Sequence, residues 1–521
     1  MKGHLRNPGG PAGSVGMVTD GGDGRGKTGA RRRAEGRTSD RFIIPMKPSN
    51  KAAANAAQRV EGRDRPGGIP CESGRVRTQS RVALPSHLAR VNEASRQDRQ
   101  IRFTALLHHV DAAALERAFR RLRRSASAGV DGETVGSYEQ GLQENLRDLC
   151  GRLHTGRYRP WPVRRVYIPK ADGGRRPLGI PALEDKLVQG AVAEVLSAIC
   201  EVDFLGYSYG FRPGRSAHQA LGALHTALMT QYVNWVLDAD IRRFFDSVDH
   251  EWLLRMVSHR IADRRVVRLI SQWLKAGVLD SGEWKETEQG TPQGAGISPL
   301  LANIFLHYVL DLWVHQWRRR YARGCVIFVR YADDFVMGFQ YASDARKMQA
   351  ALRQRLSQFN LALHEEKTRL IEFGKLPAES RARRGERHPE TFVFLGLTHY
   401  CGRTRDGRFV VKRKTQGKRM RRKLRVLRLE ARRRMHRPLP EQHRWLAQVL
   451  RGHYAYYGWP CNYRSLNTFY WQVRRLWCRA LRRRGQRRRL TWDRFNEYLV
   501  RFPLPVPTIT HPRVGPGVRL G

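Results

Sequence analysis

Cysteine, acidic residues and long apolar runs are all scarce in this chain of 521 residues. The seven cysteines are odd in number and scattered, and no pair has the spacing of a zinc knuckle or a redox motif. We therefore expect reduced thiols in the cytoplasm. No apolar run approaches the roughly 20 residues of a membrane-spanning helix, and residues 1–30 lack the apolar core of a secretory signal. These scarcities predict a cytoplasmic protein without a membrane span.

The shortage of acids leaves a large positive charge, because 96 lysines and arginines face only 47 aspartates and glutamates. The formal net charge of +49 is spread over nearly the whole chain. Such a protein repels itself unless a polyanion neutralises it, so nucleic acid is the expected partner. An anionic membrane surface is the alternative.

Two adjacent carboxylates, Asp333 and Asp334, stand between apolar runs at residues 326–329 and 335–339. Both runs are rich in β-branched and aromatic residues, which predicts a hairpin with the acidic pair at its tip. Adjacent carboxylates repel each other unless a cation neutralises them. A solvated turn is the alternative interpretation, because an isolated acidic pair is common.

A second acidic element, upstream of this pair, favours a metal site. Residues 232–241 predict a strand in which Asp238 and Asp240 share one face by the period of two. A buried strand does not carry two carboxylates on one face unless they bind something positive. In one sheet, the two acidic elements could supply three carboxylates to a pair of Mg²⁺ ions, which suits phosphoryl transfer.

The remaining pattern predicts a mixture of helices and strands. Helical periodicity covers residues 84–153, and residues 158–181 predict two strands joined by a glycine-bearing turn. Further helices are expected at 185–199, 216–232, 252–278, 299–321 and 342–359. Further strands are expected at 361–363, 369–371 and 392–395.

The acidic motifs, Tyr-Ala-Asp-Asp at 331–334 and Asp-Ile-x-x-Phe-Phe-Asp at 240–246, look like the palm of a reverse transcriptase. The surrounding sequence resembles the group II intron reverse transcriptase/maturase family. Other motifs of that family follow in its order, from about residue 95 nearly to the end of the chain. They are the segments 167–170, 175–181, 209–213, 290–294, 364–368 and 394–397.

The resemblance implies an α+β fold, that of a right-hand polymerase with fingers, a palm with an antiparallel sheet, and a helical thumb. It divides the chain into a helical RNA-binding extension (81–157), fingers and palm (158–404), a thumb/maturase domain called domain X (405–510), and a tail (511–521). Residues 1–80 are rich in Gly, Arg, Ser and Pro and predict a disordered basic leader. A transit peptide is the alternative for that leader.

In this family the catalytic carboxylates correspond to Asp240, Asp333 and Asp334. They would hold two Mg²⁺ ions, with Mn²⁺ as a substitute, and the backbone carbonyl of Ile241 would add a ligand. The resemblance implies the general two-metal scheme, in which one ion activates the primer 3′-hydroxyl and the other stabilises pyrophosphate. Asp238 is not at the family's catalytic position, so we expect it to support the site or face RNA.

The resemblance also implies which side chains meet the incoming nucleotide. Lys170 and Arg176 flank the fingers turn and match the pair that closes on the triphosphate. Gln293 and Gly294 match a loop beside the base pair being formed, where glycine lets the backbone approach closely. Lys367 matches a lysine near the primer terminus.

Phe245 occupies the position of the steric gate that collides with a ribose 2′-hydroxyl and favours deoxynucleotides. A core phenylalanine is the alternative, although Phe244 is the better candidate for the core. Asp246 is reminiscent of a carboxylate that RNA-dependent RNA polymerases use near the 2′-hydroxyl. The gate phenylalanine and the Tyr-Ala-Asp-Asp tip argue against that class.

From about residue 412 the chain becomes arginine-rich, with thin apolar stripes at helical spacing over 420–435 and 466–480. Between them lies an aromatic segment, 453–459. Arginine faces with aromatic platforms suit an RNA backbone with stackable bases, whereas an ordinary bundle with solvated arginines is the alternative. Resemblance to domain X favours RNA binding. The candidate residues are Arg421, Arg422, Arg425, Arg428, Tyr454, Tyr456 and Arg464.

Together these motifs predict an RNA-directed DNA polymerase that extends a DNA primer on intron RNA. The same protein would bind its parent group II intron RNA to assist splicing and mobility. Its expected partners are intron RNA, a DNA target and primer, and dNTPs, with no membrane. The alternatives are a maturase-only RNA-binding splicing factor and a domesticated retron or defence reverse transcriptase. We expect no C-terminal endonuclease, because the chain ends at Gly521 without the cysteine pairs of that domain.

Overall fold

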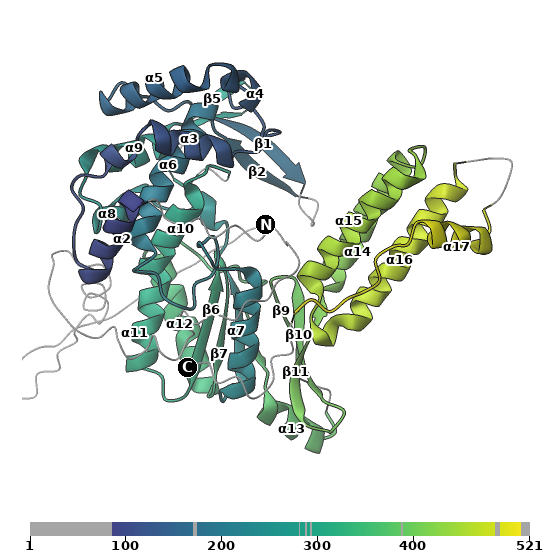
Figure 1. The fold of residues 1–521 in the computed structure, drawn as a ribbon. Helices are drawn as coiled ribbons and strands as arrows, with labels where there is room; N and C mark the ends of the chain where they lie inside the picture. The colour runs from purple at the N-terminus through teal and green to yellow at the C-terminus, as the bar shows by residue number, and fades with distance from the viewer. Residues whose placement is uncertain are drawn as a thin grey trace, which may run out of the picture.

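The computed structural model describes residues 86–169, 174–280, 282–286, 289–291, 294–386, 389–484 and 490–511, apart from the side chains of Ser86, His87 and Arg176. The predicted leader, Lys170, most of the fingers turn and Gln293 lie outside these residues. Figure 1 shows three regions: a helix-covered sheet at the top, a second sheet below it, and a helical arm to the side. Helices and strands are mixed throughout, as the α+β prediction requires, and the regions correspond to fingers, palm and thumb.

The helices predicted at 84–153 are confirmed, and they pack on the fingers. Asp111 begins one of them, because its side chain accepts a hydrogen bond from the Ala114 N–H and caps the helix. That helix, α3, lies against the long helix α6, and both bury leucines in the largest apolar core. The helices here are α2 (Ser86–Gln97), α3 (Ala112–Arg121), α4 (Val135–Tyr138), α5 (Leu142–His154) and α6 (Leu183–Cys200).

The fingers sheet has the strand order β2-β1-β4-β5. Strands β1 (Val163–Pro169) and β2 (Arg175–Ile180) form the antiparallel pair predicted at 158–181. Strand β4 (Val278–Asp280) runs parallel to β1, and β5 (Glu283–Lys285) pairs with β4 at the edge. Parallel pairing with β4 joins segments more than a hundred residues apart, which periodicity alone does not reveal.

The palm sheet is fully antiparallel, with the order β6-β7-β3-β8. Side chains along each strand point alternately to the two faces of the sheet, and each face packs against its own apolar core. Helices α10 and α12 cover one face, and α7 covers the other (Figure 1). The strands are β3 (Trp235–Asp240), β6 (Val326–Tyr331), β7 (Asp334–Phe339) and β8 (Arg369–Glu372).

The predicted helix at 252–278 is two helices, α8 (His250–Ser258) and α9 (Arg264–Lys275). Asp263 separates them, because its carboxylate caps α9 and also accepts hydrogen bonds from the backbone N–H groups of Leu106 and Leu107 at 2.7 and 3.0 Å. Although burial acts to raise the pKa of Asp263, these bonds and that from Arg265 lower it to about 2. A long-range contact therefore overrides the local helical pattern.

Two further predictions near the palm differ from the structure. The helix expected at 299–321 runs from α10 (Ser298–Leu306) to α11 (Leu312–Arg320) through a π-helical turn, His307–Asp311. The prediction of a strand at 361–363 was wrong, because Leu363 forms only an isolated bridge with Ile241. The helices expected at 216–232 and 342–359 are confirmed as α7 (Ala217–Thr230) and α12 (Ala342–Ser357).

A small sheet with the order β11-β10-β9 connects the palm to the thumb. Its strands β10 (Leu397–Arg403) and β11 (Phe409–Thr415) form a hairpin that spans the boundary predicted between 404 and 405. The helices of the thumb therefore begin later, at Gly417. The remaining elements are α13 (Lys375–Arg383), β9 (Phe392–Phe394), α14 (Gly417–Arg433), α15 (Leu439–Tyr457), α16 (Tyr463–Arg482) and α17 (Trp492–Arg501).

The thumb has its own apolar core, built from the predicted stripes. Leu427 of α14 packs with Leu466, Phe469 and Val473 of α16 in this core. Pro438 follows the end of α14 and directly precedes α15, as expected for a residue that cannot continue a helix. Within the described part of the chain, no helix combines the length and the apolar character needed to cross a bilayer.

Candidate active site

Antiparallel register brings the predicted carboxylates together at one end of the palm sheet. Asp240, the last residue of β3, lies opposite Asp334, the first residue of β7. Ala332 and Asp333 form the two-residue turn between β6 and β7, with Ala332 in the left-handed conformation at φ 57°. The hairpin with an acidic tip is thereby confirmed. Two acidic elements far apart in the sequence meet in one site.

The crowding of these carboxylates is visible in their electrostatics. Asp334 is exposed to solvent at the end of the sheet, although the neighbouring protein atoms partly desolvate its carboxylate. Burial, together with the negative charges of Asp333 and Asp240, raises the pKa of Asp334 to about 6. Repulsion of this kind favours a bound cation, because each neutralised charge lowers the cost of ionising its neighbours.

Two cationic side chains already approach the acidic strand β3. The Lys367 ammonium lies 2.6 Å from Oδ2 of Asp240, and 59% of the lysine side chain is exposed. The Arg369 guanidinium lies 3.5 Å from Oδ2 of Asp238. Burial raises the pKa of Asp238, and Arg369 partly offsets this. Lys367 thus lies beside the acidic site, as predicted, and Asp238 has an arginine partner of its own.

The donor chemistry of this site fits Mg²⁺, which prefers carboxylate oxygens and keeps several of its waters. Within the described residues, no three His, Cys, Asp or Glu side chains are already drawn together as a ready-made metal centre. Asp240 is instead engaged by Lys367.

The backbone around Asp240 is held by the segment that carries Lys367. The N–H of His364 donates to the Asp240 carbonyl at 2.8 Å, and the N–H of Arg242 donates to the Ala362 carbonyl at 2.8 Å. Ile241, the predicted source of a carbonyl ligand, is buried between these two bonds. These two hydrogen bonds hold the backbone on both sides of Ile241, whose carbonyl is the predicted metal ligand.

The turn at Ala332 is packed against a glycine from an earlier motif. A Cβ atom on Gly210 would lie 2.2 Å from the Ala332 nitrogen, so only glycine allows this approach. Arg330, which no sequence motif above singled out, lies directly behind the turn and donates to the Ala332 carbonyl at 3.0 Å. Its only sequence signal was a charged residue inside an apolar strand.

Phe245 and Phe244 have different environments. Phe244 is buried in the largest core, whereas Phe245 is only partly buried and touches Phe244 edge to face at 5.3 Å between ring centroids. The Phe245 carbonyl accepts a hydrogen bond from the Thr291 N–H at 2.7 Å. Phe244 is therefore the core residue of the pair, as predicted, and Phe245 is the accessible one.

Gly294, from the motif predicted to lie beside the nucleotide, packs against strand β2 of the fingers. Gly294 has φ 118°, and a Cβ atom there would lie 2.5 Å from the Gly179 carbonyl of β2. The same strand carries Arg176, whose backbone pairs with Ile168. Lys170 and Gln293 are outside the described residues, so their predicted roles stay predictions. The structure brings the segments of Arg176 and Gly294 together.

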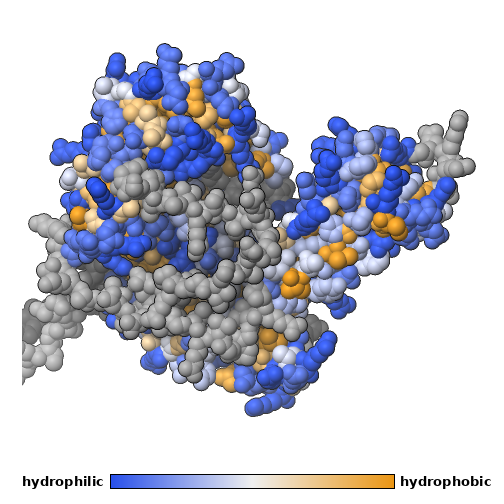
Figure 2. Space-filling view, viewed as in Figure 1, coloured by the Kyte–Doolittle hydropathy of each residue, from blue (hydrophilic) through white to orange (hydrophobic). Residues whose placement is uncertain are grey.

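The predicted RNA-binding arginines lie on the exposed surface of the thumb. Arg421, Arg422, Arg425 and Arg428 are all exposed on α14, and Arg464 is exposed at the start of α16. Glu430, the only acid of α14, pairs with Arg434 at 2.6 Å instead. Figure 2 shows hydrophilic residues over much of the visible thumb and fingers. These arginines are available to a polyanion.

The two tyrosines predicted to stack on RNA bases both donate hydroxyl hydrogen bonds within the protein, and Tyr454 is buried. Tyr454 is 2% exposed in the thumb core, and its hydroxyl donates to the Pro505 carbonyl at 3.1 Å. The Tyr456 hydroxyl donates to the Leu395 carbonyl at 2.9 Å, which joins the thumb to the palm. Burial removes the ring face of Tyr454 from any base, so the stacking prediction for this residue needs correction. Exposed aromatic residues of α16, such as Trp471, were not foreseen.

Comparisons with known proteins point to the same region of the chain. The sequence profile for reverse transcriptase (RNA-dependent DNA polymerase) matches residues 168–399. Protein YkfC of Escherichia coli (strain K12) is 38% identical over 238 residues, which cover 40% of this chain and 62% of that protein. The group II intron-encoded protein LtrA of Lactococcus lactis subsp. cremoris is 38% identical over 207 residues, which cover 40% of this chain and 34% of LtrA.

A third relative, an uncharacterized 91 kDa protein in the cob intron of Schizosaccharomyces pombe, is 46% identical over 160 residues, 31% of this chain and 20% of that protein. The chain thus spans between about a fifth and three fifths of the length of these relatives. The reverse transcriptase match includes Asp240, Asp333 and Asp334 and ends before the thumb helices.

Proposed function

We infer that the chain is a member of the group II intron reverse transcriptase/maturase family and an RNA-directed DNA polymerase acting on intron RNA. The observation that carries the proposal is the pairing of Asp240 with Asp334 across β3 and β7, with Asp333 in the adjoining turn. Three carboxylates at the end of an antiparallel sheet suit phosphoryl transfer to a primer 3′-hydroxyl.

Asp240, Asp333 and Asp334 would hold the divalent ions, and the Ile241 carbonyl would add an oxygen. When bound, the ions supply an activated primer hydroxyl and charge stabilisation for departing pyrophosphate. Lys367, which contacts Asp240, would place a cation beside the primer when the ions are bound.

The fingers supply the cations for the triphosphate. Arg176 lies on β2, the strand whose Gly179 meets Gly294, and Lys170 follows the last residue of β1 in the sequence. Charge on a hairpin that closes over the nucleotide offsets the triphosphate only in the productive complex. Phe245, the accessible phenylalanine, then limits the space beside the sugar and favours deoxynucleotides.

We also propose that the thumb binds the parent group II intron RNA and assists its splicing and mobility. The exposed arginines of α14 and Arg464 of α16 support this role, because phosphate contacts dominate affinity for nucleic acid. The proposed partners are intron RNA, a DNA target and primer, and dNTPs, and the proposed compartment is the cytoplasm.

Extension of a DNA primer on an RNA template tests the polymerase. Asp333→Ala should abolish extension, because it removes a metal ligand worth several kcal/mol of transition-state stabilisation, and about 1.4 kcal/mol is tenfold in rate. Asp406→Ala, on the exposed β10–β11 turn, is the matched control and should extend normally. Intron RNA affinity should survive Asp333→Ala, because binding does not use that carboxylate.

The outcomes separate the two proposed activities. Near-normal extension by Asp333→Ala would remove the assigned site. Wild-type protein that binds intron RNA and promotes splicing but extends no primer would favour a maturase-only splicing factor. Extension without intron RNA affinity would favour a domesticated reverse transcriptase.

A further inference from the structure

Arg330 is a cation buried completely inside the palm. It lies on β6, one residue before Tyr331, and its side chain is 0% exposed. Its guanidinium makes two hydrogen bonds to the carboxylate of Asp311, from Nε at 2.7 Å and from Nη2 at 2.5 Å. Asp311 is also 0% exposed. A buried pair of this kind is expensive to desolvate, so simple stabilisation is a weak reason for its presence.

The rest of the guanidinium reaches the turn and its supports. Nη1 donates to the Ala332 carbonyl at 3.0 Å and to Oδ1 of Asn303 at 3.1 Å, and Nη2 donates to the Ser208 hydroxyl at 2.7 Å. Each of the three guanidinium nitrogens thus donates at least one hydrogen bond. The planar fork of arginine can make these contacts at once, which a lysine ammonium cannot.

Asn303 closes a ring behind the acidic turn. Its Nδ2 donates to the Gly210 carbonyl at 2.7 Å while its Oδ1 accepts from Arg330. Gly210 in turn lies against the Ala332 nitrogen, where a Cβ atom would approach to 2.2 Å. Ala332, the residue that precedes Asp333, is therefore held at both ends, at its nitrogen by packing against Gly210 and at its carbonyl by Arg330.

The turn needs such support because its backbone conformation is unfavourable. Ala332 has φ 57°, a left-handed conformation that is unfavourable for a residue other than glycine. The π-helical turn His307–Asp311 supplies the acid that neutralises Arg330. Extra-residue turns of this kind are frequent at functional sites.

We propose that Arg330, with Asp311 and Asn303, is a positioning residue that fixes the Ala332–Asp333 turn and so orients the Asp333 and Asp334 carboxylates toward the ions and the primer. This rests on the proposed polymerase function. Arg330 does not touch substrate; it acts through the Ala332 carbonyl. A side chain that orients a metal ligand typically contributes about 10–100-fold to metal affinity or activity.

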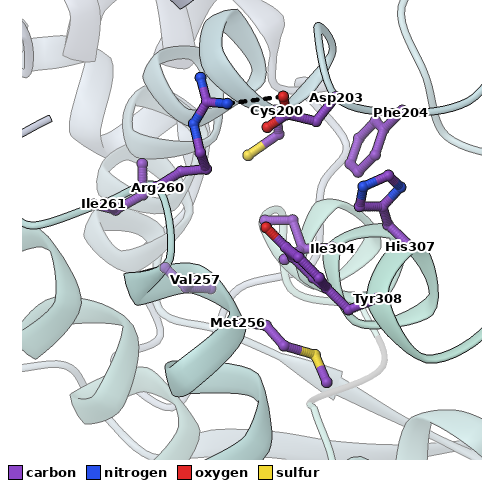
Figure 3. Close-up of a pocket in the computed structure, with 10 residues that line it drawn as sticks. All are labelled: Cys200, Asp203, Phe204, Met256, Val257, Arg260, Ile261, Ile304, His307 and Tyr308. Carbon is purple, nitrogen blue, oxygen red and sulfur yellow. Dashed lines mark hydrogen bonds and ion pairs between the residues drawn. The ribbon is translucent and has the colours of Figure 1, made fainter. Parts of the chain in front are cut away.

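The alternative is that Arg330 is only a core ion pair, and the chain offers a matched control for that. Arg260 is also a buried arginine, 3% exposed, with its Nη1 2.9 Å from Oδ1 of Asp203 and its Nη2 2.6 Å from the Ser95 hydroxyl. It lines a small pocket between α6, α8 and α10 (Figure 3), and its hydrogen-bond partners Ser95, Arg99 and Asp203 lie outside the candidate site. Arg260→Lys therefore reports the cost of replacing a buried, ion-paired arginine.

The experiment compares full-length wild type with Arg330→Lys and Arg260→Lys. It measures thermal unfolding, Mn²⁺ binding without nucleic acid by calorimetry, and primer extension across a Mg²⁺ series. We expect both variants to lose some stability. Only Arg330→Lys should weaken Mn²⁺ binding and lower kcat, by roughly 10–100-fold, with the KM for dNTP nearly unchanged.

A second variant keeps the test valid if Arg330→Lys fails to fold. Asn303→Ala removes the bridge between Gly210 and Arg330 without unpairing a buried charge, and it should show the same weaker Mn²⁺ binding. Unchanged Mn²⁺ affinity and kcat in the folded variants would overturn the positioning role. Wild type that binds Mn²⁺ but extends no primer would overturn the polymerase proposal, which is a different outcome.

Discussion

Phe245 and Phe244 are adjacent aromatic residues with opposite environments, and this difference makes a residue-scale test possible. Phe244 is 2% exposed in the main core, whereas Phe245 is partly buried beside the Gly290–Thr291 segment. Removing Phe244 leaves a cavity and destabilises the palm. Removing Phe245 opens space at the surface that faces the predicted nucleotide site. The two substitutions should therefore separate packing from sugar selection.

Phe245→Val should raise ribonucleotide incorporation relative to deoxynucleotide incorporation, because it relieves the collision with the 2′-hydroxyl. The measurement is the ratio of kcat/KM for dNTP and for rNTP, with thermal unfolding as a check on folding. Phe244→Leu is the control and should lower stability while leaving that ratio unchanged. An unchanged ratio in Phe245→Val would place the gate at another residue.

At the scale of elements, a buried acid joins helix α6 to the segment that leads into β1. Asp185 is 1% exposed, accepts a hydrogen bond from the Trp161 N–H at 3.1 Å, and accepts another from the Tyr158 hydroxyl. The Trp273 indole of α9 donates to the same hydroxyl at 3.1 Å. Burial is the largest influence and raises the pKa of Asp185 to about 7, although both hydrogen bonds lower it. Glu184 and Asp131 raise it further.

This raised pKa predicts a pH dependence of stability with a definite sign. Between about pH 4 and pH 7 the folded chain binds a proton at Asp185 that the unfolded chain has lost. The free energy of unfolding should therefore fall as pH rises through this window, by up to about 1.4 kcal/mol per pH unit from this group. Asp185→Asn should remove that contribution.

The measurement is denaturant unfolding of wild type and Asp185→Asn at several pH values from 4 to 8. The difference between the two curves isolates this carboxyl from the many other titrating groups. A difference that stays constant with pH would show that Asp185 is ionised in the folded protein throughout. Asp406→Asn, in an exposed turn, is the matched control and should not alter the curve.

At the scale of the whole molecule, the net charge of +49 raises the question of whether RNA binding has a defined surface. The four arginines of α14 are exposed on one helix, while Leu427 and Ala431 of that helix are buried. Substitution of the arginines therefore leaves the packing of α14 in place. The positive charge of α14 can therefore be reduced without disturbing the packing of the thumb core.

Replacing Arg421, Arg422, Arg425 and Arg428 with Gln should weaken intron RNA binding and flatten its salt dependence. Each lost phosphate contact removes roughly 0.7–0.9 from the slope of log K against log salt. The measurement is affinity across a salt series. The control replaces Arg346, Lys347 and Arg353, exposed cations of palm helix α12, with Gln. An equal loss of slope per charge in both variants would indicate general attraction rather than a thumb interface.

Local patterns in the sequence were sufficient for several elements and for drawing attention to the central acids. Alternation with a period of two predicted β3 and the shared face of Asp238 and Asp240, and the flanking apolar runs predicted the β6–β7 hairpin. Apolar stripes predicted α14 and α16. These features depend on neighbouring residues only, because backbone geometry sets the period.

Only the tertiary structure decided which distant residues meet. The register of β3 on β7, the contact of Lys367 with Asp240, and the ring of Arg330, Asn303 and Gly210 join segments that no local pattern connects. Burial likewise turned Tyr454 from a predicted base platform into a core residue. The physical reason is the same in each case: burial and long-range hydrogen bonding depend on the packing of whole elements, which overrides local propensity.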